Sequence, residues 1–288
     1  MPPLKKDPRE RSRTRNTRRA FVSVAMASLI AAIATGCSPS PSTPEPTATS
    51  PFKAPATVSE LSFPVTISHR GGALVYPEES MEGFTASAED GFLPEMDIQF
   101  LSDGTPVLIH DETADRTLTG ASGEIRDLSR KQWDQATITN PTDGPAAETV
   151  TLTELLDELG GEVVLVPEIK PGATTAEVDQ VLDEFDDRDL QNSLIVQSFD
   201  FRTASTIAER GFTSLYLFEA SLPKESPTQI ADAGIDWVGP NRGLPATDIA
   251  LLADAGLKVA PYGLKTAEDA EVLPDEVSGW FTDDPWDK

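Results

Sequence analysis

The sequence predicts an α/β protein with the (β/α)8 arrangement of a TIM barrel. From residue 65 onward, short apolar runs alternate with amphipathic stretches, which indicates parallel βα units. Several of these runs are almost wholly apolar, as expected for strands that are buried on both faces. Nine runs are close to the eight strands of such a barrel, and the 228 residues from 61 to 288 are a typical length for one.

The predicted strands are short, and predicted helices lie between most of them. The strand-like runs read VTIS, MDIQF, PVLIH, VVLVPEIK, LIVQSF, SLYLFE, DWVGP, LKVAPYGL and GWFTD. The helix-like stretches are residues 152–159, 174–186, 200–210, 224–233, 245–255 and 266–272. Pro94 and Pro167 fall within strand-like runs. Because proline cannot donate to a central ladder, we expect each strand to begin or bulge there.

One part of the pattern departs from a regular barrel. MDIQF and PVLIH are separated only by LSDGT, which is too short for a parallel crossover. We therefore expect either a local hairpin or an irregular barrel near the second and third runs. Residues 111–150 are long, polar and turn-rich, which is typical of a functional loop or a small insertion. We expect an insertion after His110, and both a lid and a subdomain stay open.

The first 36 residues predict an export signal. Residues 1–19 carry eight basic side chains, and an uncharged run of 17 residues follows and stops at Cys37, the only cysteine. A basic segment, an apolar segment and small residues before a cleavage site form the secretory pattern. The alternative, a membrane-spanning helix, needs about 20 strongly apolar residues. This run is shorter and is diluted with Ala, Ser, Thr and Gly.

Two short motifs refine this prediction. ATGC resembles a bacterial lipobox, which implies that Cys37 is lipidated and anchors the protein on the outer face of the cytoplasmic membrane. TRRAFV resembles the twin-arginine export signal, so Sec and twin-arginine export both stay open. Residues 37–60 are rich in Pro, Ser and Thr and predict an extended linker. The expected organisation is thus a signal peptide (1–36), a lipidated cysteine with its linker (37–60) and one catalytic domain (61–288).

The chain is strongly acidic once the basic N-terminus is set aside. The full sequence has 23 basic and 48 acidic side chains, of which eight and two fall in residues 1–36. The remainder holds 15 and 46, a formal charge of −31. Such a surface repels nucleic acid and anionic lipid headgroups. We therefore expect no nucleic-acid partner, and a phosphate substrate would need a local positive site.

Polar side chains gather at the ends of the predicted strands, where a parallel barrel places its catalytic groups. Glu95 and Asp97 are two residues apart on one strand, so both side chains point to the same face. The chain has only two histidines, and both fall at such strand ends. The candidates are His69, Arg70, Glu95, Asp97, His110, Glu168, Lys170, Gln197 and Ser198.

Seven short motifs in order resemble the glycerophosphodiester phosphodiesterase family, over roughly residues 65–285. They read HRGG, PEES, EMD, SDG, IHD, EIK and TDDP. The resemblance implies metal-dependent hydrolysis of glycerophosphodiesters to sn-glycerol 3-phosphate and an alcohol. It implies that one divalent cation is bound by Glu95, Asp97 and Glu168, that His69 and His110 are the acid–base pair, and that Arg70 and Lys170 hold the phosphate.

Elementary chemistry supports the same roles. A cation held by three carboxylates can neutralise the charge that grows on a phosphodiester in the transition state. Ligands that are all oxygen favour a hard ion, Mg²⁺ or Ca²⁺, and flexible loops tilt the choice toward Ca²⁺. Two imidazoles titrate near neutral pH, which suits proton transfer to and from the reacting oxygens. Attack by water and attack by the adjacent glycerol hydroxyl, through a cyclic phosphate, both stay open.

The motifs also depart from the family. Glu79 stands where the family usually has Asn, which adds negative charge near the phosphate. Glu78, Asp111 and Gln197 are expected around the metal ligands and histidines rather than on the cation. PYGLK replaces the family's late Trp–Thr–Val–Asn segment, so the preferred alcohol stays open. Trp280 and Phe281 near the last strand suit either the core or a substrate platform.

Two other functions remain as alternatives. The first is a non-catalytic lipoprotein that binds phosphoryl ligands, but pure binding would not need two imidazoles. The second is a phospholipase D- or C-like enzyme acting on phospholipid or lysophospholipid. Such an enzyme would favour an apolar rim facing the membrane, which a domain of charge −31 fits poorly. The sequence does not define the oligomeric state.

Overall fold

The structure is a computed structural model that describes residues 50–287. The chain divides into two compact units, and the description below concerns the unit that begins at Ala48. The predicted export signal, Cys37 and most of the predicted linker lie outside the described residues. Among the described helices, none combines the length and the apolar character that crossing a membrane requires.

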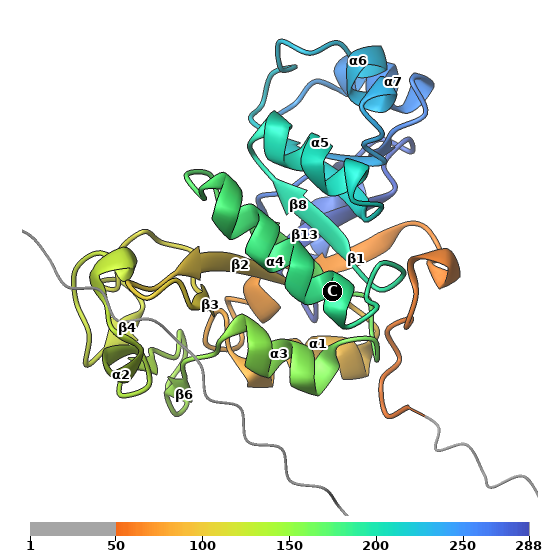
Figure 1. The fold of residues 1–288 in the computed structure, drawn as a ribbon. Coiled ribbons are helices and arrows are strands. Elements are labelled where there is room, and N and C mark those ends of the chain that lie inside the picture. The colour runs from red at the N-terminus through yellow and green to blue at the C-terminus, as the bar shows by residue number, and fades with distance from the viewer. Residues whose placement is uncertain (1–49, 288) are drawn as a thin grey trace, which may run out of the picture. The chain divides into compact units, whose positions relative to one another are not determined.

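Parallel strands form the barrel, in the order β11-β10-β9-β8-β7-β2-β1-β13. Figure 1 labels β8, β2, β1 and β13 among them. The circle closes because Ser278 N–H donates to Val259 O at 2.7 Å and Phe281 N–H to Pro261 O at 2.9 Å. β12 also pairs with β13 and lies four residues after β11, so it continues the same strand position. The strands are β1 (Val65–Ser68), β2 (Leu93–Phe100), β7 (Val166–Ile169), β8 (Ile195–Ser198), β9 (Thr213–Phe218), β10 (Trp237–Pro240), β11 (Lys258–Val259), β12 (Leu264–Thr266) and β13 (Gly279–Asp284). The predicted α/β barrel is confirmed.

Helices connect these strands. In α4, for example, Thr174 and Glu177 form a capping box at the start, and buried Val178, Val181 and Phe185 follow at helical spacing. The helix α1 was not predicted, because Gly, Ser and Thr dilute its apolar face. The predicted helix at 266–272 is a 3₁₀ segment, η4 (Glu268–Val272). The α-helices of the barrel are α1 (Met81–Asp90), α3 (Leu152–Leu159), α4 (Thr175–Asp187), α5 (Phe201–Glu209), α6 (Pro227–Asp232) and α7 (Ala246–Asp254).

The short connection after β2 forms a hairpin. β3 (Pro106–Leu108) pairs antiparallel with β2, with Ile98 opposite Leu108 and Phe100 opposite Pro106. β3 lies off the path of the barrel strands. Of the two arrangements that the sequence left open, the hairpin is therefore correct, and one of the nine strand-like runs does not belong to the barrel.

Residues 111–150 form a small subdomain with its own core. A three-stranded antiparallel sheet contains β4 (Leu118–Thr119), β5 (Thr137–Ile138) and β6 (Ala147–Glu148), and α2 (Arg130–Trp133) and the 3₁₀ segment η3 (Ile125–Asp127) accompany it (Figure 1). Trp133 is fully buried in an apolar cluster that includes Val107 and Ile109, beside His110. The insertion is thus anchored directly next to one of the two histidines.

The end of the predicted linker lies against the barrel. Lys53 N–H and Ala54 N–H both donate to Ala88 O, and Val58 N–H donates to Asn192 O at 2.8 Å. Ala54 is buried, and the 3₁₀ segment η1 (Val58–Glu60) follows. The folded unit therefore includes residues before 61, the start expected from composition, because a few apolar side chains and backbone groups are enough to hold them.

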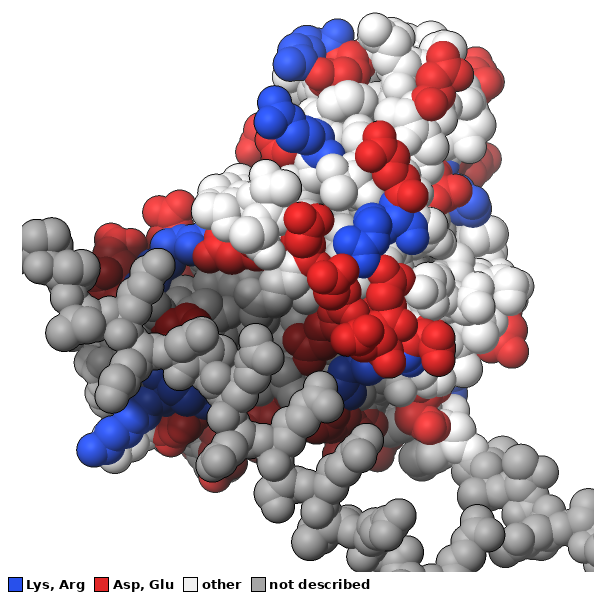
Figure 2. Space-filling model, viewed as in Figure 1, with Lys and Arg blue, Asp and Glu red and all other residues white. Residues whose placement is uncertain are grey.

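Acidic side chains are prominent on the face seen in Figure 2. Red side chains gather over the middle of that view, where α4 lies, and its outward side chains include Asp179, Asp183 and Asp187. The acidic composition of the sequence is thus expressed as exposed negative charge on this face. Such a surface repels polyanions, so any anionic substrate depends on cations inside the site.

Candidate active site

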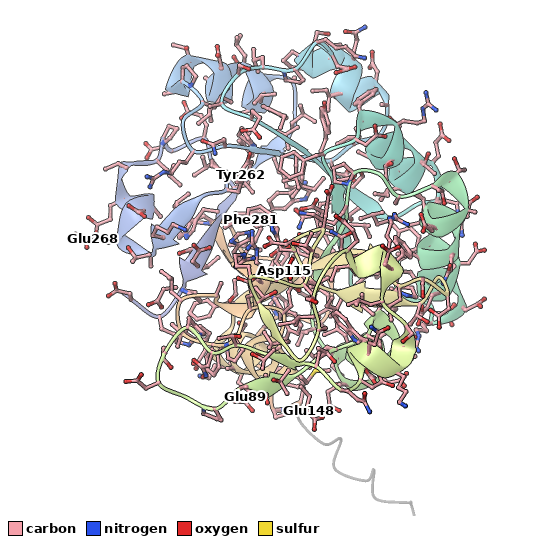
Figure 3. All side chains as sticks on the ribbon, turned by 90° about the vertical axis from the view of Figure 1, so that its left-hand side faces the viewer. Glu89, Asp115, Glu148, Tyr262, Glu268 and Phe281 are labelled. Carbon is pink, nitrogen blue, oxygen red and sulfur yellow. The ribbon has the colours of Figure 1, made fainter. Side chains whose placement is uncertain are left out.

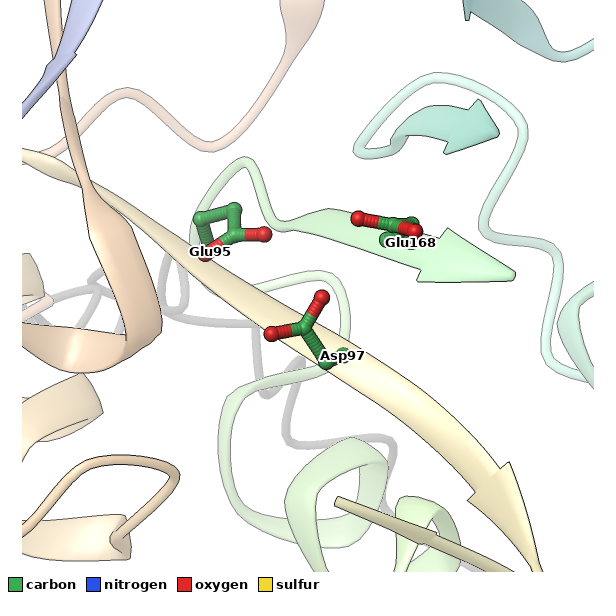
Figure 4. A group of neighbouring side chains, drawn as sticks. All are labelled: Glu95, Asp97 and Glu168. Atoms are coloured by element: carbon green, nitrogen blue, oxygen red, sulfur yellow. The ribbon is translucent and has the colours of Figure 1, made fainter. Parts of the chain in front are cut away.

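Three buried carboxylates face one another across two neighbouring strands. Glu95 and Asp97 lie on β2, and Asp97 is the direct cross-strand partner of Glu168 on β7. Figure 4 shows the three carboxylates turned toward a common space. Each of them offers an oxygen within 4.8 Å of the others, and none is more than 4% exposed. The prolines before Glu95 and Glu168 are each the second residue of a strand, so both strands begin there without a bulge.

The cluster fits a hard divalent cation. Among the described residues, no hydrogen bond reaches Asp97 Oδ2 or Glu168 Oε1, although both atoms are buried. Lys170 Nζ lies 3.2 Å from Asp97 Oδ1 and from Glu168 Oε1, and Arg70 Nε lies 3.4 Å from Asp97 Oδ2. Two positively charged side chains, Arg70 and Lys170, therefore face three carboxylates. Neither of these two buried oxygens accepts a hydrogen bond from the described part of the chain, although a basic side chain lies near each, and a bound cation would supply the missing contacts.

Burial and mutual repulsion separate the pKa values of these acids. Burial and the charge of Asp97 raise the pKa of Glu168 to about 8, and the same causes raise the pKa of Glu95 well above its usual value. Although burial opposes it, the charges of Lys170 and Arg70 hold the pKa of Asp97 below its ordinary range. Without a cation, Asp97 is thus the acid that stays ionised at neutral pH.

We expect cation binding to release protons. A carboxylate must be ionised to bind the metal, and Glu168 with a pKa of about 8 holds a proton below that pH. Cation affinity should therefore rise as the pH approaches about 8 and Glu168 loses its proton. Calorimetric titration at pH 7 in two buffers with different ionisation enthalpies measures the released protons. Equal binding enthalpies in the two buffers would contradict this prediction.

The HRGG segment forms a tight left-handed turn above the acids. Arg70, Gly71 and Gly72 have φ values of 53°, 74° and 90°. A Cβ at Gly72 would lie 2.5 Å from a ring carbon of Trp286, so only glycine fits there. The turn directs Arg70 N–H to Glu95 Oε2 at 2.7 Å. The backbone of this turn thus holds Glu95, a candidate metal ligand. The same turn places the side chain of Arg70 beside Asp97.

Each histidine is held by a carboxylate through Nδ1. His69 Nδ1 lies 2.5 Å from Asp283 Oδ1, and His110 Nδ1 lies 2.8 Å from Asp111 Oδ1. The hydrogen bonds of Arg116 bring the pKa of Asp111 to about 2. The pKa of Asp283 is also about 2, because its bonds to His69 and Lys265 outweigh burial. Because an ionised carboxylate only accepts, Nδ1 of each ring donates. Within residues 50–287 no hydrogen bond reaches Nε2 of either ring, which leaves that atom for substrate.

One cavity of about 230 Å³ brings the candidates together. Figure 3 looks onto the barrel from the side of the insertion, with Tyr262 and Phe281 toward the middle and Glu148 and Glu268 near the edge. Part of the cavity lining is polar and contains both histidines, and the rest, here called the apolar wall, is largely hydrophobic. Its lining residues are His69, Arg70, Glu95, His110, Glu168, Lys170 and Gln197, with Phe199, Leu217, Tyr262, Gly263 and Phe281.

The remaining candidates lie around this cavity. Gln197 Nε2 donates to Glu95 Oε1 at 2.9 Å, and Ser198 Oγ donates to a backbone carbonyl of β7. Glu78 lies 3.6 Å from Arg70. Glu79 is buried and accepts from Asp97 N–H at 3.2 Å, and burial and the charge of Asp97 raise its pKa well above the usual value. Glu79 therefore supports β2, and its left-handed φ of 61° is one that Asn adopts more readily.

Sequence reasoning missed several residues of the site. Asp283 stands in the TDDP motif but was not singled out, and Lys265 contacts it from β12. Arg116 comes from the polar insertion, where no periodic pattern marks it. Phe199 and Leu217 form part of the apolar wall, and Phe281 is both buried and at the cavity, which answers the question that the sequence left open. Trp280 does not line the cavity.

Comparisons with known proteins agree on one group. The model of the Glycerophosphoryl diester phosphodiesterase family matches residues 69–286. "Glycerophosphodiester phosphodiesterase 1" of Rattus norvegicus is 46% identical over 67 residues, which are 23% of this chain and 20% of that protein. A putative glycerophosphodiester phosphodiesterase of Bacillus subtilis, YhdW, is 30% identical over 151 residues, 50% of this chain and 60% of that protein. The chain thus matches only part of the length of these relatives.

Solved structures share the fold over most of the barrel. A putative glycerophosphoryl diester phosphodiesterase from Agrobacterium tumefaciens has a TM-score of 0.67 and 24% identity, over 78% of this chain and 95% of that one. A phosphodiesterase from Oleispira antarctica, solved in complex with the product sn-glycerol-3-phosphate, has a TM-score of 0.66 and 19% identity, over 77% and 94%. At these identities, the two structures support the barrel fold.

Proposed function

This chain belongs to the glycerophosphoryl diester phosphodiesterase family, and on that premise we propose that it hydrolyses glycerophosphodiesters to sn-glycerol 3-phosphate and an alcohol. The observation that carries the proposal is the single cavity of about 230 Å³ that both histidines line together with Arg70 and Lys170. The Oleispira antarctica relative, solved with sn-glycerol-3-phosphate as product, supports the same substrate class.

The side chains of the cavity divide the reaction between them. Arg70 and Lys170 hold the phosphate, and their positive charges compensate for the acidic surface outside. One histidine takes a proton from the attacking hydroxyl at Nε2, and the other gives a proton to the leaving alkoxide. Burial and the charges of Arg70 and Lys170 lower the pKa of His110, which favours the neutral ring that a general base requires.

Glu95, Asp97 and Glu168 would hold one divalent cation, which when bound supplies positive charge beside the phosphoryl oxygens. Three carboxylates without nitrogen or sulfur ligands favour Ca²⁺ or Mg²⁺. Gln197 orients Glu95 by donating to it. The apolar wall, which includes Phe199, Leu217 and Tyr262, packs against the carbon skeleton of the organic part of the substrate and limits the access of water.

A panel of substrates tests this proposal. Glycerophosphocholine, glycerophosphoethanolamine, bis(p-nitrophenyl) phosphate and a lysophospholipid are each assayed with Ca²⁺, Mg²⁺ or a chelator. We expect release of sn-glycerol 3-phosphate from the first two only, and only with a cation. Preferred cleavage of the lysophospholipid would favour the phospholipase alternative. Tight phosphate binding without turnover of any substrate would favour the binding lipoprotein.

We further propose that the mature protein is attached to the outer face of the cytoplasmic membrane through a lipid on Cys37. The support is the lipobox-like ATGC sequence after a basic and then an apolar segment. Replacement of Cys37 by Ser is expected to move the protein from the membrane fraction to the soluble fraction of the producing bacterium. Unchanged membrane fractionation of Cys37→Ser would contradict lipidation.

A further inference from the structure

A single arginine of the insertion binds two carboxylates at the rim of the cavity. Arg116 Nε and Nη2 donate to Asp111 Oδ2 and Oδ1 at 2.6 and 2.9 Å. Its Nη1 and Nη2 donate to Glu78 Oε2 and Oε1 at 2.8 and 2.6 Å. All four carboxylate oxygens thus accept from one guanidinium. The planar guanidinium thus forms a bidentate pair with each carboxylate, which the single ammonium group of lysine cannot do.

Each of these two carboxylates also contacts a candidate catalytic side chain. Asp111 Oδ1 lies 2.8 Å from His110 Nδ1, and Glu78 Oε1 lies 3.6 Å from Arg70 Nη1. Asp111 follows the hairpin strand β3, whereas Glu78 belongs to the connection between β1 and α1. Arg116 therefore links two loops that are distant in sequence. In one loop it binds Asp111, which contacts His110, and in the other it binds Glu78, which lies beside Arg70. Both His110 and Arg70 line the cavity.

We infer that Arg116 is a positioning residue for the phosphodiesterase reaction, which fixes the ring of His110 through Asp111 and the guanidinium of Arg70 through Glu78. This inference rests on the proposed function. Since Arg116 does not line the cavity, it acts through these partners and not on substrate. The insertion thereby gains a role, because its folded core delivers this arginine to the site.

The stability of the fold depends little on this contact. The side chain of Arg116 is 49% exposed, and its pair with the part-exposed Asp111 contributes little to stability. Glu78 is only 12% exposed, but it keeps Arg70 at 3.6 Å when Arg116 is removed. The same insertion offers a matched control. Arg126 is 45% exposed and donates to Glu177 of α4 at 2.6 Å, and it neither lines the cavity nor contacts Asp111 or Glu78. Removing either arginine breaks one contact between the insertion and the barrel. Only Arg116 is connected to a histidine, His110, through Asp111.

Kinetics of the full-length protein provide the first test. With glycerophosphocholine and saturating Ca²⁺, Arg116→Ala should lower kcat by about 10- to 100-fold, since hydrogen bonds to charged groups are lost. Arg116→Lys should fall between wild type and Arg116→Ala, and Arg126→Ala should keep kcat within about twofold. Both alanine variants should lower Tm by no more than about 4 °C. A kcat for Arg116→Ala equal to that of Arg126→Ala would overturn the inference.

Nuclear magnetic resonance of ¹⁵N-labelled histidine provides a readout without turnover. The chain has only two histidines, so each ring is observed by itself. In Arg116→Ala, the ring nitrogens of His110 should move toward the values of mixed tautomers, whereas those of His69 should stay unchanged. Unaltered His110 signals would overturn the inference. If the wild-type protein cleaves no glycerophosphodiester, the proposed function fails while this spectrum still decides the role of Arg116.

Discussion

Replacement of His110 or His69 by alanine is expected to lower kcat for glycerophosphocholine by about 10³-fold, within the range that a single acid–base group contributes. Both rings line the cavity, and each has Nδ1 engaged by an aspartate, so Nε2 is the atom available for proton transfer. Steady-state rates of glycerol 3-phosphate release measure the effect. Because the two groups act in one reaction, the double variant should be little slower than either single one.

The control for the histidine variants is folding. The side chains of His69 and His110 are 22% and 35% exposed, so their removal leaves no large cavity in the core. Thermal unfolding of each variant should therefore stay close to that of the wild type. A correctly folded His69→Ala or His110→Ala variant that retains a kcat within about tenfold of wild type would remove that residue from the acid–base role.

Removal of the cation is expected to have an effect at least as large. Dialysis against a chelator should lower turnover by about 10³-fold or more, because a cation at the phosphate contributes several kcal/mol to the transition state. Added Ca²⁺ or Mg²⁺ should restore the rate. The expected ligands, Glu95, Asp97 and Glu168, are buried and within 4.8 Å of one another.

Substitutions in the cluster give a second readout, independent of turnover. Cation binding should raise the Tm of the wild type, and the shift should grow with the cation concentration. In Glu168→Gln, one charge of the site is removed while its shape is kept, so the shift should be much smaller. Glu177→Gln, in the first turn of α4, removes a carboxylate that is not in the cluster and should respond like wild type. Hydrolysis that resists the chelator, or an equal Tm shift in Glu168→Gln, would contradict the metal site.

Much of the fold could be predicted because its signals are local. Apolar runs that alternate with helical stretches led to the barrel. The five residues of LSDGT excluded a parallel crossover and left the hairpin between β2 and β3 as one of two arrangements. The limits of the elements were less certain. Helix α1 escaped because its apolar face is interrupted, and residues 52–58 were assigned to a linker although they contact the barrel.

The site could be predicted in part. Seven motifs pointed to the family, which the match over residues 69–286 confirms. The rule that catalytic groups follow parallel strands placed His69 and Lys170 at one end of the barrel, and both line the cavity. His110 lines it as well, but it follows β3, which is antiparallel and lies off the path of the barrel strands. Arg116 and Lys265 were not predicted, because the role of each depends on its contact with a carboxylate. No pattern in the neighbouring sequence indicates that contact.

The sequence alone thus determined the type of fold and most of the polar residues that line the cavity, because periodicity and motif spacing are properties of short segments. Tertiary structure alone decided that Asp97 lies directly opposite Glu168, that Asp111 and Asp283 each hold a histidine, and that the insertion carries an arginine to the rim. These contacts join residues distant in the chain. Their distances follow from strand register and loop paths, which no local pattern encodes.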